Sequence, residues 1–159
     1  MGLGVANQHA SSNMLAHSTD APRPPLLGEN GKRIVARSTV SRARVLAEAL
    51  FARADGPPPV SRLDWLEWQV EDFLARAGTQ SRLFFSFLLW LCSWLAPLFI
   101  LRLRGLGGLS LPERTRALAA LERRFGEPLL AIKAILCLIY YEHPDAARSV
   151  GFDDRCLRQ

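Results

Sequence analysis

Apolar residues recur three and four positions apart along most of the chain after residue 36. This spacing places them on one face of a helix, and the same residues show no alternation of period two that would indicate strands. The sequence therefore predicts an all-α fold, a compact bundle of five to six helices. The expected helices span residues 38–52, 61–77, 79–101, 110–126, 128–141 and 144–151.

The predicted helix starts carry residues that suit them. Ser38 or Thr39, Ser61, Thr79 and Ser110 are the expected N-caps. The Ser61 and Ser110 positions also have an acid three residues later, which is the spacing of a capping box. Residues 1–36 carry Pro, Gly, Ser and Asn without periodicity, so we expect a flexible N-terminal arm followed by one helical domain, 37–159.

The segment LFFSFLLWLCSWLAPLFIL, residues 83–101, has two serines as its only polar side chains. It is about as long as a bilayer span requires, and arginines flank both ends. Pro97 should kink or end the helix, and Ser86 and Ser93 lie on one face. The segment 83–101 could therefore be covered by another protein or be in contact with a membrane, and the sequence favours cover by a protein. The second apolar segment, 129–141, is too short to span a bilayer and should be buried.

The helix at 61–77 has an apolar stripe and two tryptophans outside it. Leu63, Leu66, Val70, Phe73 and Leu74 form the stripe. Trp65 and Trp68 project from the charged side. They either pack beneath another helix of this chain or anchor a partner, since tryptophan is enriched in interface anchors.

The charged and polar residues bear on three possible functions: nucleic-acid binding, catalysis, and cofactor or metal binding. The formal charge of +5 comes from arginines scattered among acids, without a nucleic-acid motif, so we expect no nucleic-acid partner. His143 is the one histidine of the helical region and is expected at a helix junction. The chain has no HExxH, CxxC or phosphate-binding loop. These features predict that the chain is not an enzyme by itself and binds no cofactor or metal.

Three cysteines, an odd number, cannot form a disulfide framework within the chain and favour a reducing, cytoplasmic setting. Cys92 and Cys137 lie in apolar segments, and Cys156 lies in the polar tail, where it could pair with a partner. No Sec or twin-arginine export signal is visible, which fits the cytoplasmic expectation.

The C-terminal stretch LLAIKAILCLIYYEHPDAARSVGFDD resembles the gluconate 2-dehydrogenase subunit 3 family. The matching positions are Tyr140, Tyr141, Pro144, Gly151, Phe152 and Asp153. Phe152 stands where the family usually has tyrosine. The segment VSRARVLAEALFARADGPPP is also similar to the family's opening segment, with Ala52 in place of the usual proline.

The resemblance implies a noncatalytic small, gamma-type subunit that docks on and stabilises a large FAD-dependent glucose–methanol–choline (GMC) oxidoreductase. That partner would hold the FAD and act on an alcohol, sugar or sterol hydroxyl. The alternative is a membrane-associated anchor that inserts residues 83–101 into the bilayer. Expected partner contacts are Trp65, Trp68, Phe87, Trp90, Trp94, Tyr140, Tyr141, Pro144, Phe152 and Cys156.

Overall fold

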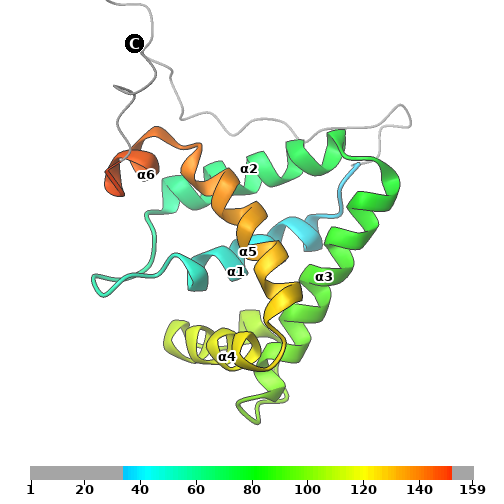
Figure 1. Cartoon of the computed structure of the whole chain (residues 1–159), viewed down its shortest axis with the longest axis vertical. Helices are drawn as coiled ribbons and strands as arrows, with labels where there is room; N and C mark the ends of the chain where they lie inside the picture. Colours follow the sequence, from blue (N-terminus) through cyan, green and yellow to red (C-terminus); the bar gives the residue numbers. More distant parts are fainter. Residues whose placement is uncertain (1–33, 152–159) are drawn as a thin grey trace, which may run out of the picture.

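The computed structural model describes residues 34–151, except for the side chains of residues 127 and 128. All its regular structure is helical, which confirms the predicted all-α bundle (Figure 1). The helices are α1 (Arg37–Leu50), α2 (Val60–Arg76), α3 (Thr79–Leu98), α4 (Leu111–Arg124), α5 (Gly126–Tyr141) and α6 (Pro144–Ser149), with a 3₁₀ turn, η1 (Leu106–Gly108), between α3 and α4.

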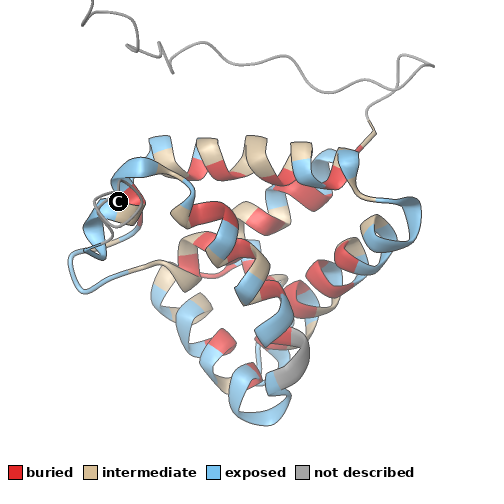
Figure 2. Ribbon diagram, turned by 45° about the horizontal axis from the view of Figure 1, so that its top comes forward, coloured by how far each residue is buried: buried red, intermediate tan, exposed pale blue. Residues whose placement is uncertain are grey.

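The bundle is arranged around α1 and α5. In Figure 1, α2 and α3 form two adjoining sides, α5 crosses between them, and α4 lies at the far end. The largest side chains that are fully enclosed come from several helices, including Leu46, Leu66, Leu89 and Leu136. Figure 2 shows the buried parts of the helices, in red, turned mainly toward the middle of the bundle. Packing of apolar stripes, rather than intrinsic helix propensity, therefore stabilises these short helices.

One predicted cap is confirmed and the others differ. Ser110 and Glu113 form a capping box in which the Glu113 carboxylate accepts from the Ser110 backbone N–H at 3.0 Å. By contrast, α2 begins at Val60, directly after Pro59, and has no side-chain cap. The fixed backbone of Pro59 suits a helix start, and Asp64 accepts a hydrogen bond from Arg44 of α1 at 2.6 Å instead of capping.

The start of α1 also differs from the prediction. The helix begins at Arg37, after Ala36, and Thr39 is buried inside the first turn instead of capping it. Val35, expected at the end of the N-terminal arm, is 2% exposed and belongs to the core. The rest of that predicted arm, 1–33, lies outside the described residues.

Apolar side chains stay exposed at three places in the bundle. Phe73 of α2 is 44% exposed and Phe125, between α4 and α5, is 48% exposed. Helix α5, expected to be enclosed on all sides, leaves Leu130 and Leu138 at 62% and 71% exposure. A bundle of this size encloses only part of each helix surface, so uniform hydrophobicity does not produce uniform burial.

Candidate docking surface

One face of α3 carries five large apolar side chains that the rest of the chain leaves uncovered. Leu83, Phe87, Trp90, Trp94 and Leu98 are 64%, 54%, 45%, 51% and 49% exposed. At 100° per residue they fall within a sector of ~80°, and at 1.5 Å per residue they extend over ~22 Å. We call these five residues the α3 ridge.

The opposite face of α3 belongs to the core. Phe85, Leu88, Leu89, Cys92 and Ala96 are at most 7% exposed. This face packs against α1, α4 and α5, and Figure 2 shows the buried positions of α3 turned inward. The segment 83–101 is therefore divided lengthwise between a core face and an uncovered face.

The C-terminal end of the ridge is a turn with two protruding leucines. Pro97 lies in the last turn of α3, and the helix ends at Leu98, as expected from the proline. The Arg102 backbone N–H donates to the Pro97 carbonyl at 3.0 Å, and Leu101 takes a left-handed conformation with φ of 57°. The side chains of Leu101 and Leu103 are 92% and 90% exposed. The uncovered apolar surface thus continues beyond the helix.

Along the sequence, positive charge stands only before and after the ridge. No charged residue stands between Leu83 and Leu101 in the sequence. Arg82 precedes the ridge, and Arg102 and Arg104 follow it. Arg102 pairs with Glu113 at 3.1 Å, whereas Arg82 and Arg104 have no ion pair within residues 34–151.

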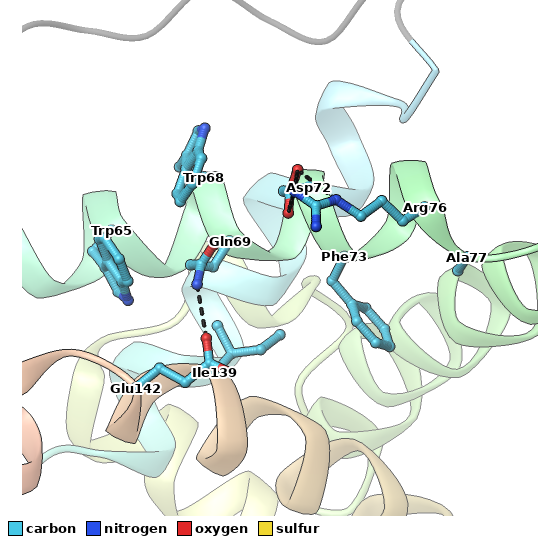
Figure 3. A pocket seen from close by; sticks show the side chains of 9 residues that line it. All are labelled: Trp65, Trp68, Gln69, Asp72, Phe73, Arg76, Ala77, Ile139 and Glu142. Atoms are coloured by element: carbon cyan, nitrogen blue, oxygen red, sulfur yellow. Dashed lines mark hydrogen bonds and ion pairs between the residues drawn. The ribbon is translucent and has the colours of Figure 1, made fainter.

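A second candidate surface is the groove between α2 and α5, with a volume of about 590 Å³ (Figure 3). Trp65 lies in it against the ring of His143, 5.5 Å between centroids. Gln69 donates to the Glu142 carboxylate at 2.7 Å across the groove. Trp65 is therefore largely used in holding α2 against the start of α6, and Trp68, also partly buried, lines the same groove.

The tyrosine pair lies mainly inside the chain. Tyr140 is 4% exposed and stacks on Phe51 with ring centroids 4.0 Å apart, and Tyr141 meets the edge of the same ring at 6.0 Å. Tyr140 therefore cannot offer a partner much surface, contrary to its predicted anchoring role. Pro144 is exposed at the first position of α6. The predicted contacts Phe152 and Cys156 lie outside the described residues.

Two further titratable side chains, His143 and Cys92, lie at a helix junction and in the core. Within residues 34–151, no three His, Cys, Asp or Glu side chains are placed to hold a metal ion. His143 caps α6 by accepting from the Asp145 backbone N–H at 3.3 Å, as expected for a junction residue, and burial lowers its pKa. Burial raises the pKa of the Cys92 thiol to about 11, so this cysteine is a protonated core residue at neutral pH.

The candidate contacts Phe87, Trp90 and Trp94 are brought together on the ridge, whereas Trp65 and Tyr140 lie on α2 and α5. Leu83 and Leu98 of the ridge, and Leu101 and Leu103 beyond it, were not named from the sequence. A helical projection of residues 83–98 would have aligned the first two with the aromatic residues. The exposure of the two loop leucines follows from the turn after Pro97, which the sequence does not specify.

Among the described residues, α3 is long and apolar enough to cross a membrane. Crossing would withdraw Leu89 and its neighbours from their contacts with the other helices, so the fold and a span are competing arrangements of the same segment. The chain matches no family model, no curated protein and no solved structure. The resemblance described above therefore stays a prediction.

Proposed function

We propose that this chain is a noncatalytic subunit that docks on a larger protein through the α3 ridge. Following the sequence resemblance, the partner is a large FAD-binding GMC oxidoreductase acting on an alcohol, sugar or sterol hydroxyl. The observation that carries the proposal is the line of half-exposed rings and leucines on a helix whose other face is fully packed. Aromatic residues in such a line are typical anchors of protein interfaces.

The size of the surface supports this role. An aromatic side chain buries 150–250 Å² when covered, so three half-exposed rings alone offer ~300 Å². Leu83 and Leu98 extend this area, and the largest apolar patch of a monomeric protein is ~300–600 Å² and often functional. A standard interface buries ~800 Å² on each partner, so docking would also cover polar surroundings of the ridge and the loop at Leu101.

In this proposal the two chains have different roles. The large partner binds FAD and carries out the oxidation, and this chain covers an apolar surface of the partner and stabilises it. Mutual cover also stabilises this chain, because binding to the folded state shifts its unfolding equilibrium. Substrate specificity then resides in the partner.

Co-expression of the chain with a large FAD-binding GMC oxidoreductase from the same genome tests the proposal. Affinity purification through this chain should yield a complex with flavin absorbance. The double variant Trp90→Ala/Trp94→Ala should lose the flavoprotein. The control Leu130→Ala/Leu138→Ala removes exposed apolar groups from α5 and should retain it.

Two results would contradict the proposal in different ways. Retention of the flavoprotein by the ridge variant would show that docking uses another surface. Failure of the wild-type chain to bind any such oxidoreductase of its genome would show that the partner class is wrong.

A further inference from the structure

The arginines before and after the α3 ridge indicate the charges expected on the partner surface. The ridge has no charge along ~22 Å, and unpaired arginines stand at each end, Arg82 before it and Arg104 after it. We propose, building on the proposed function, that the partner presents an apolar trough closed at both ends by carboxylates. One end would pair with Arg82 and the other with Arg104.

Charge argues against a second copy of this chain as the occupant. An antiparallel pairing of two ridges would set Arg82 of one copy beside Arg104 of the other, and a parallel pairing would set each arginine beside itself. Either arrangement places like charges together at both ends, which opposes specific association. The ridge therefore fits a different chain with acidic ends.

Charge also argues against a lipid surface. A helix that lies in the membrane interface usually carries Lys and Arg along its polar face, level with the headgroups. Helix α3 has no cation over its whole length after Arg82, and its other face is packed inside the bundle. Cations at the ends alone match a bounded trough better than a continuous anionic surface.

The first test measures association of the full chain with its FAD-binding partner at low and at high ionic strength. The pair Arg82→Glu/Arg104→Glu should slow association ~10-fold at low salt, because steering charges chiefly change the on-rate. The difference should disappear in high salt, where screening shortens the range of the charges. Arg37→Glu/Arg116→Glu makes the same change in net charge at exposed positions of α1 and α4 and serves as the control.

The second test locates the partner carboxylates. Arg82→Lys and Arg104→Lys keep the positive charge and supply amines, which a carbodiimide joins to a touching carboxylate as an amide with loss of water. Each variant should give one cross-link to an Asp or Glu of the partner. The two cross-links should lie at separate positions in the partner. Lys133, which pairs with Glu122 on another part of the bundle, is an internal control.

The outcomes separate the two proposals. A complex that needs Trp90 and Trp94 but ignores the charge reversal, and gives no cross-links, overturns the acidic trough and leaves the proposed function standing. A complex that survives loss of both tryptophans overturns the proposed function itself. Binding of the wild-type chain to vesicles of phosphatidylcholine and phosphatidylglycerol through the ridge, or self-association through it, overturns the trough in favour of lipid or a second copy.

Discussion

The division of α3 into a packed face and an uncovered face can be tested with two identical substitutions on one helix. Leu89 is fully buried, whereas Leu83 is 64% exposed. Replacing each with alanine removes the same atoms and changes helix propensity equally. The difference in the free energy of unfolding between Leu89→Ala and Leu83→Ala then reports the environment alone.

The expected magnitudes follow from burial. Loss of three buried carbons at about 0.8 kcal/mol each costs ~2.4 kcal/mol, and the cavity adds a further cost, so Leu89→Ala should lose about 3–4 kcal/mol. Leu83 has about a third of its surface covered, so its replacement should cost less than ~1 kcal/mol. Urea unfolding followed by circular dichroism measures both values, and at a slope of ~1–3 kcal/mol/M the two midpoints should differ by ~1 M or more.

Two results would refute the reasoning. Equal losses of several kcal/mol would mean that the ridge is a core surface in the folded chain. Equal small losses would mean that α3 does not pack into the bundle in water, as expected of a helix that instead crosses a bilayer.

Three further measurements address local features. Ser110→Ala should cost about 1 kcal/mol in thermal or urea unfolding, because it removes half of the capping box with Glu113; no loss would contradict the box. Burial lowers the pKa of His143, so the unfolded chain binds a proton at this residue more readily than the folded chain. The free energy of unfolding should therefore fall as pH drops below about 6.5. A His143→Asn variant with an unchanged pH profile would contradict this. Cys92, with its pKa raised to about 11, should resist iodoacetamide at neutral pH until urea unfolds the chain; labelling of the folded chain at Cys92, mapped by mass spectrometry, would show that its site is open.

The existence and order of the helices could be predicted because each has its own periodic stripe. The capping box at Ser110 was also predictable, since it depends on two residues three positions apart. The starts of α1 and α2 differ from the prediction, and two of the residues expected to form the caps have other roles. Thr39 is buried, and Asp64 binds Arg44 of a neighbouring helix.

The orientation of α3 was harder to predict because both of its faces are apolar. Hydropathy therefore gives little direction, and side-chain size separates the faces only in part, because Phe85 and Leu89 lie on the inner face. Cys92 and Ala96 allow close packing on the inner face, whereas Trp90 and Trp94 lie on the outer one. The burial of Tyr140 could likewise not be predicted from the sequence, because its stacking partner Phe51 is far away along the chain.

Leu101 has a backbone conformation that lowers the stability of the fold and a side chain that is available to a partner. A residue with a Cβ in this conformation costs roughly 1–2 kcal/mol, a cost that glycine avoids. Leu101→Gly should therefore raise the melting temperature of the chain while removing an apolar group that is 92% exposed. Such a variant would be more stable as a free chain and would bind its partner more weakly. An unchanged or lower melting temperature would show that the backbone of this turn is not strained.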